Sequence, residues 1–309
     1  MPVASPVGST ISVGRQGRLN INAKTLCFTK AIPMSTREIV ANLENVICGD
    51  IDPPIQRMQK GREIVGWQFE FDFTWPILEV WLPLLGITNL GSNVFELGAT
   101  DLAVAFPVQV DLRGALHDID AAYVTKWAFR GSKGSRPSSL SVEIIGSQET
   151  EGTTFTPDKV AYGDMFSFTH SSMTLENGAG SDIARAFDRF LIQVDNKLVA
   201  EHNNSVFVTD ATIGDRQAVL ATSVPYVAAH DDLYWDYKDD EDGKKSVVTL
   251  DNGTKSVAFL MPTGMAVAKP GSITGMADQI RTPITLLLGR SDNVGTRVSP
   301  LKITVINSP

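Results

Sequence analysis

The sequence predicts a mainly β fold, made of two tandem β-sandwich or barrel-like domains that each carry one flanking α-helix. Three observations support this prediction. Apolar and polar residues alternate with period two in several short segments, as in strands buried on one face. Only two segments show helical spacing, which is too few for the crossovers of a parallel α/β sheet. The order of these elements then repeats along the 309-residue chain.

The clearest strand runs from Gly66 to Phe73 and places Trp67, Phe69, Phe71 and Phe73 on one face. An aromatic stripe of this kind could stack on bases or sugars. Next to an apolar helix, however, it more often forms the core against which the helix packs. Further strands are expected at Val104–Leu112, Ser139–Ile145, Phe190–Val194, Ala218–Val224, Val247–Leu250, Ser256–Met261 and Pro283–Leu288.

Two segments are expected to be helical. The first, Trp75–Leu85, follows Thr74 as a possible N-cap, has Pro76 in its first turn and stops at Gly86. The second, Val227–Trp235, is more polar and its helical pattern is weaker.

The order of elements suggests an internal duplication. In the first half, Gly61 introduces a strand, a helix follows, and the last strand closes at Gly146. In the second half, Gly214 introduces a strand, the second helix follows, and the last strand closes at Gly289. We interpret this repetition as two copies of one β-rich unit.

A polar, Thr-rich stretch without apolar periodicity, Ser147–Gly163, marks the expected boundary. We place the first domain, with an N-terminal arm, at residues 1–150. The linker covers 151–163 and the second domain 164–309.

Composition argues against several functions. A formal net charge of −8 disfavours tight binding to duplex DNA, which needs clustered Lys and Arg, whereas an acidic surface can let DNA pass by repulsion. The two cysteines, Cys27 and Cys48, form no disulfide framework or zinc motif. The first residues lack a signal-peptide pattern and no apolar stretch reaches the ~20 residues of a membrane helix. We therefore expect a protein that is made and kept in a cytoplasm, with no membrane partner.

No motif predicts catalysis, a cofactor or a metal. The acidic stretch Asp236–Lys245 fails the calcium-loop pattern, because aligning Gly243 to the sixth position places Lys238 first and Thr249 twelfth. His117 and His230 each lie near aspartates, a common arrangement on protein surfaces. Neither a nucleophile elbow nor a phosphate loop is present. We expect no catalytic, cofactor or metal residues, and a protein that is not an enzyme.

Three runs carry a resemblance to a known family. The run GREIVGWQFEFDFTWPILEVWLPLLG resembles the strand-to-helix segment of the tail tube proteins of long-tailed bacteriophages. The run from Met165 to Val199 is similar to the start of that family's second domain, where a strand ends in an Asp-Asn turn, here Asp195 and Asn196. PITLLLGRS is similar to the last strand of the same unit. The resemblance covers about residues 15–295, as an order of elements.

The resemblance implies a virion protein whose rings stack into a hollow tail tube through which DNA passes without specific binding. Two tandem tube domains imply a trimeric ring with pseudo-sixfold symmetry. The implied partners are further copies of the chain and the tape-measure and tail-terminator proteins.

Stacking needs loops or arms that bridge the rings. The candidate segments are Met1–Arg15, Ser147–Gly163 and Asp236–Lys245. The candidate inter-ring or inter-subunit residues are Arg15, Glu149, Glu151, Asp158, Lys159, Asp239, Asp240, Glu241, Asp242 and Lys244.

Alternatives remain at this point. The chain could be another tube-like component, such as a distal tail protein or the tube of an injection machine. It could also be a two-domain β-sandwich that binds glycans or peptides, which would require Trp127, Trp235 and Tyr237 to be exposed. An enzyme using His117 or His230 is the least favoured alternative.

Overall fold

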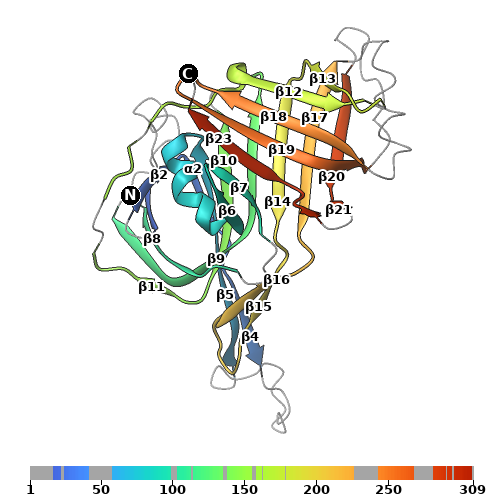
Figure 1. Ribbon diagram of the computed structural model, residues 1–309. Helices are drawn as coiled ribbons and strands as arrows, with labels where there is room; N and C mark the ends of the chain where they lie inside the picture. The colour runs from blue at the N-terminus through green and yellow to red at the C-terminus, as the bar shows by residue number, and fades with distance from the viewer. Residues whose placement is uncertain are drawn as a thin grey trace.

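The structure is a computed structural model and confirms a mainly β fold (Figure 1). It describes residues 17–21, 24–41, 58–98, 103–112, 114–134, 138–154, 158–161, 163–177, 179–225, 243–267, 281–289, 291–293 and 296–307.

The N-terminal unit is the part of the fold that ends with β11. A single α-helix, α2 (Trp75–Trp81), followed by the 3-10 turn Leu82–Leu84, interrupts its described strands. These strands are β1 (Gly17–Ile21), β2 (Lys24–Phe28), β3 (Lys30–Pro33), β4 (Thr36–Ala41), β5 (Met58–Asp72), β6 (Ile87–Gly91), β7 (Val94–Leu97), β8 (Phe106–Leu112), β9 (Ala115–Ser132), β10 (Ser139–Gly146) and β11 (Glu149–Glu151).

The C-terminal unit begins after a short 3-10 turn, Phe168–His170. Its described strands are β12 (Ser171–Glu176), β13 (Asp182–Arg185), β14 (Arg189–Asp195), β15 (Leu198–Glu201), β16 (Asp210–Ile213), β17 (Gln217–Pro225), β18 (Lys244–Asp251), β19 (Lys255–Ala266), β20 (Arg281–Leu288), β21 (Ser291–Asn293), β22 (Thr296–Val298) and β23 (Lys302–Asn307).

The two units share one antiparallel strand order. In the N-terminal unit the neighbours run β2-β1-β8-β9-β10-β5-β3. In the C-terminal unit they run β13-β12-β18-β19-β20-β17-β14. Each strand of the first series therefore has a counterpart in the second, in the same place in the chain order. Both units also contain a long hairpin. In the N-terminal unit, β3 and β4 both pair with β5. In the C-terminal unit, β14 pairs with β17, and β15 pairs with β16.

Strand β9 joins the two units edge to edge. Its N-terminal part pairs with β8, and its C-terminal part, Lys126–Ser132, pairs with β14 along Arg189–Asp195. The last described strand, β23, also returns to the N-terminal unit and pairs with β7 while holding β19 on its other side. As a result, 19 strands form one continuous hydrogen-bonded sheet, which folds over on itself (Figure 1).

Both units contribute to one apolar core. The stripe predicted on β5 is confirmed, since Trp67, Phe69, Phe71 and Phe73 are at most 2% exposed. Where the units meet, four rings contributed by both of them cluster together. Phe73 lies 5.0 Å from Phe129 and 4.9 Å from Phe166 between ring centroids, and Phe129 lies 4.9 Å from Phe259.

The first helix is shorter than expected. The α-helix ends at Trp81 and continues as a 3-10 turn, because Pro83 has no N–H to donate to the preceding turn. Thr74 takes the N-cap position, but its hydroxyl makes no capping bond. Gly86 stops the segment with a φ of 73°, a conformation that suits glycine. The second expected helix, Val227–Trp235, lies outside the described residues.

The strands predicted from alternation are all found, although several are longer than expected. β5 begins at Met58, well before Gly66, and β19 extends to Ala266. The strands that the sequence analysis did not name include β1, β4, β15, β16 and β23, each of which is only four to six residues long.

A buried carboxylate fastens β1 to β8. Arg18 donates from Nε and Nη2 to Oδ2 of Asp111 at 2.9 and 2.6 Å, and the Gly114 N–H donates to Oδ1 at 2.8 Å. Burial alone would raise the pKa of Asp111, but the Gly114 bond and the Arg18 guanidinium outweigh it and lower the pKa below 3.8.

Asp111→Asn should destabilise the protein at neutral pH by about 1–2 kcal/mol, because the amide cannot replace the ionised acceptor. The folded pKa is depressed, so the contribution of Asp111 is present above pH 3.8 and lost as pH falls through the folded pKa. Urea unfolding of both proteins at pH 7 and pH 3 would test this. A difference in unfolding free energy that does not shrink at pH 3 would contradict it.

Candidate assembly surfaces

The contact between the units is fastened by a buried amide. Asn196 follows β14 and is 2% exposed. Its backbone N–H donates to the Thr125 carbonyl at 2.8 Å, and its Nδ2 donates to the Val124 carbonyl at 2.9 Å, so both bonds reach β9. Its Oδ1 accepts from Arg216 Nε at 3.0 Å, and Nη1 of Arg216 donates to the Gly98 carbonyl at 2.9 Å. One side chain thus connects the C-terminal unit to the central strand of the N-terminal unit.

The Asp-Asn turn noted in the sequence is this same place. Asp195 accepts the backbone N–H of Lys197 at 2.9 Å and pairs with its Nζ at 3.0 Å, while Lys197 has a φ of 47°. Burial opposes ionisation of Asp195, but these contacts with Lys197, helped by Lys126, lower its pKa overall. The turn is therefore held by the backbone and by charge, and it directs Asn196 into the unit contact.

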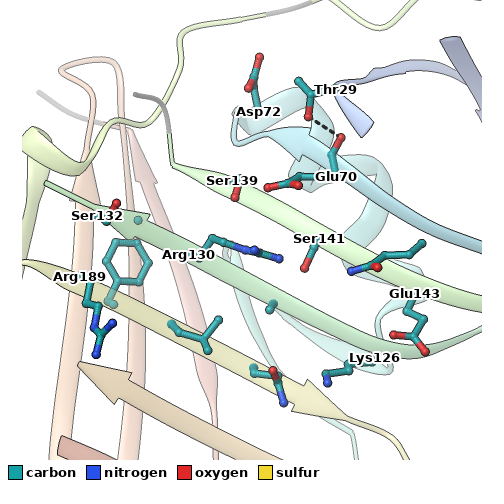
Figure 2. Close-up of a pocket in the computed structure, with 16 residues that line it drawn as sticks. Thr29, Glu70, Asp72, Lys126, Arg130, Ser132, Ser139, Ser141, Glu143 and Arg189 are labelled. Atoms are coloured by element: carbon teal, nitrogen blue, oxygen red, sulfur yellow. Dashed lines mark hydrogen bonds between the residues drawn. The ribbon is translucent and has the colours of Figure 1, made fainter. Parts of the chain in front are cut away.

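A shallow polar groove of about 680 Å³ lies on the outer face of β5, β10, β9 and β14 (Figure 2). Side chains from both units line it and point away from the core. Three carboxylates, Glu70, Asp72 and Glu143, lie among three cations, Lys126, Arg130 and Arg189, so the charges balance. Hydroxyls of Thr29, Ser132, Ser139 and Ser141 lie between them. The groove is a mixed-charge surface that crosses the unit contact.

Glu143 is half-buried in this groove. Burial raises its pKa above 4.5; Lys126 opposes that shift, and Asp195 adds to it. Above the raised pKa the folded state must therefore hold a poorly solvated charge on β10.

Glu143→Gln should stabilise the protein by about 0.5 kcal/mol at pH 8, because the amide removes that charge. The native state binds more protons than the unfolded state between pH 4.5 and the raised pKa, so wild-type stability falls as pH rises through that window. The gain of the variant over wild type should therefore grow above pH 4.5, as measured by thermal unfolding at a series of pH values. As a control, Lys126→Gln removes the cation that opposes the shift. The stability of this variant should therefore fall more steeply with rising pH than that of the wild type. A gain that is equal at pH 4 and pH 8 would contradict the assignment.

A second feature is the hairpin arm, defined as β4, the N-terminal part of β5, β15, β16 and the loop between β15 and β16. These strands project together from the lower end of the fold (Figure 1). The two hairpins touch, because the Glu63 N–H donates to the Val206 carbonyl at 2.9 Å. At the base of the arm, Tyr123 of β9 packs with Val208 and Ala211 in a small apolar cluster.

The arm carries exposed apolar side chains. Val199 is 56% exposed and Val206 is 37% exposed. Single exposed valines are common, but here they lie on an element that stands away from the main body.

No protein-family model matches the chain, and no curated protein matches it. Arguments about function therefore depend on the molecule itself.

The candidate loop residues are not gathered in one place. Glu149 and Glu151 lie on β11, where Glu149 pairs with Nδ1 of His117 at 2.7 Å. Asp158 pairs with Nζ of Lys24 at 2.6 Å, and its carbonyl accepts the Thr25 N–H. Residues 158–160 of the expected linker thus lie along β2, where Lys159, also exposed, forms a parallel bridge with Thr25. Lys244 begins β18 and is half-buried. Arg15, Asp239, Asp240, Glu241 and Asp242 lie outside the described residues, and an assembly role for any of the ten stays a prediction.

Several observations bear on the alternatives. Trp127 is fully buried and donates its indole N–H to the Leu85 carbonyl at 3.1 Å, so it offers no surface to a sugar or peptide. Trp235, Tyr237 and His230 lie outside the described residues. Within the described ranges, no group of three or more His, Cys, Asp and Glu side chains could hold a metal ion. In the same ranges, no helix combines the length and apolar character needed to cross a membrane.

Proposed function

We propose that this chain is a structural protein that self-assembles into stacked rings, forming the hollow tail tube of a long-tailed bacteriophage. The observation that supports this proposal most strongly is the way the two units join. Two units with the same strand order meet edge to edge through β9 and β14, within one continuous sheet. A unit that accepts a neighbour by strand pairing can accept further neighbours in the same way.

The tandem-domain interpretation belongs to this proposal. The N-terminal domain covers residues 1–150, and the C-terminal domain covers 164–309 after a linker at 151–163. Each contributes one subunit-like position to the ring. Three chains then give a ring with pseudo-sixfold symmetry, in which contacts within and between chains alternate.

The balanced groove supports a role in passing DNA. If the face carrying Glu70, Glu143, Lys126, Arg130 and Arg189 lines the lumen, DNA meets no continuous cationic surface. Without such a surface there is little counterion release to hold the phosphates. The proposal therefore includes no specific DNA contact and no cofactor. It places the protein in the virion, with the tape-measure and tail-terminator proteins as partners.

The hairpin arm supports stacking. It projects away from the sheet that joins the units and carries Val199 and Val206 on its surface. An element of this shape can reach a neighbouring ring, whereas the sheet edges serve contacts within one ring.

Sedimentation of purified protein over a concentration series tests the proposal. A tube-forming protein should shift from slow species to rapidly sedimenting particles above a threshold concentration. Val199→Glu together with Val206→Glu should raise that threshold, while Val104→Glu, a similarly exposed valine outside the arm, is the control. A chain that stays monomeric at millimolar concentration, with the presumed tail partners added, would contradict the function.

A further inference from the structure

The contact between the units within one chain has two counterparts, β3 and the end of β19, each with one side that pairs with no strand among the described residues. β14 bonds β17 on one side and β9 on the other. Its counterpart β3 bonds β5 on one side, and no described strand lies on its other side. β9 offers its C-terminal part to β14, beyond the place where its pairing with β8 ends. Its counterpart β19 likewise continues beyond the end of β18.

The open edge of β3 presents backbone groups for pairing. The Met34 N–H donates to the Gly66 carbonyl, and the Phe73 N–H donates to the Ser138 carbonyl on the opposite side of β5. Because hydrogen-bonded pairs alternate along an antiparallel ladder, Lys30 and Ile32 bond to β5. The N–H and C=O of Ala31 therefore point to the open side.

The end of β19 presents a matching edge. Pairing with β18 ends at Gly264, which lies opposite Lys244. The Val267 N–H donates to the Thr285 carbonyl, and Met265 lies opposite Leu287, so these residues bond to β20. By the same alternation, the backbone groups of Ala266 point away from β20 toward the open side.

Exposed apolar side chains mark the second edge. Met265 is 48% exposed, Val267 is 60% exposed and Leu287 is 44% exposed. They lie together, because Met265 faces Leu287 across the ladder and Val267 follows on the same side of β19. An open strand edge beside an apolar patch is a site for association.

We propose that copies of this chain join head to tail by antiparallel strand pairing between β3 of one copy and the end of β19, Met265–Val267, of the next. This contact between chains has the same form as the β9–β14 contact, which joins the two units within one chain. It deepens the proposed function, because it names the surface through which the ring would close. The two edges belong to different strands, so the contact is heterologous and leads to a closed ring or an open filament.

Engineered thiols test the contact directly. The background carries Cys27→Ser and Cys48→Ser, and the test variant adds Lys30→Cys and Val267→Cys. A short bismaleimide should convert the assembled test variant into a ladder of covalent oligomers on denaturing gels. Each single-cysteine variant alone should stay monomeric, and a mixture of the two should give dimers. The matched control pairs Lys30→Cys with Thr254→Cys, an exposed loop position on the C-terminal unit, and should give no ladder.

The outcomes separate this contact from the proposed function. No ladder in protein that still sediments as large particles would overturn the contact and leave the function standing. Dimers from a single-cysteine variant would also overturn it, since they indicate pairing of like edges. Failure of the parent protein to associate at all would overturn both.

A backbone variant gives a second test. Ala31→Pro removes the outward N–H and leaves the bonds of Lys30 and Ile32 to β5 in place. It should raise the concentration needed for assembly at least tenfold, while Ala31→Val, which keeps the N–H, should not. Circular dichroism of the monomers would show whether the proline variant is folded. Unchanged assembly by a folded Ala31→Pro protein would overturn the contact.

Discussion

Phe129→Ala should destabilise the protein by about 4 kcal/mol, the range for emptying a buried aromatic position. Phe129 is 1% exposed, lies on β9, and contacts Phe73 of the N-terminal unit and Phe259 of the C-terminal unit. The cavity would open where the two units share their core, so neighbouring elements of both would lose contacts.

Calorimetry and urea unfolding would measure this effect. We expect one transition in wild type and variant alike, because the sheet and the core are continuous between the units. Phe187→Ala serves as the matched control, since Phe187 is only half-buried at the edge of the core, and it should cost less. A variant that unfolds in two steps, with the C-terminal unit unaffected, would contradict the shared core.

Asn196→Ala should cost about 2–4 kcal/mol, because it removes the two hydrogen bonds that this buried side-chain amide makes. The Val124 carbonyl loses the Nδ2 donor, and Arg216 loses its acceptor on Oδ1. Arg216 keeps the bond from its Nη1 to the Gly98 carbonyl.

Asn203→Ala is the matched control for this change. Asn203 is exposed in the loop between β15 and β16, so the same substitution there should alter stability by less than about 0.5 kcal/mol. Chemical denaturation gives both values. Equal, small effects at the two positions would show that the buried amide does not hold the units together.

Sequence patterns within short stretches of the chain predicted several strands and the first helix. The aromatic alternation of β5 fixed which side chains form the core, and Pro76 and Gly86 bracketed α2 closely. Pro83 ended the α-helix at Trp81, earlier than expected. The strands expected at the start and the end of each half, β5 and β10 in the first and β17 and β20 in the second, are also present.

The connections between the units were not predictable from local patterns. The pairing of β9 with β14 joins residues far apart in the chain, and no local periodicity records which strand edge accepts a distant partner. Asn196 was noticed only as a turn residue, whereas its amide bonds to β9 give it its structural role. The hairpin arm was missed because its two hairpins stand away from the main body and need no apolar face along their length.

The measurement that tests the account most directly is negative-stain electron microscopy of the purified protein across a concentration series, with class averages of the particles. The account predicts rings with threefold or pseudo-sixfold symmetry that stack into hollow tubes as the concentration rises. Particles that remain single featureless monomers at every concentration, with the presumed tail partners present, would contradict it.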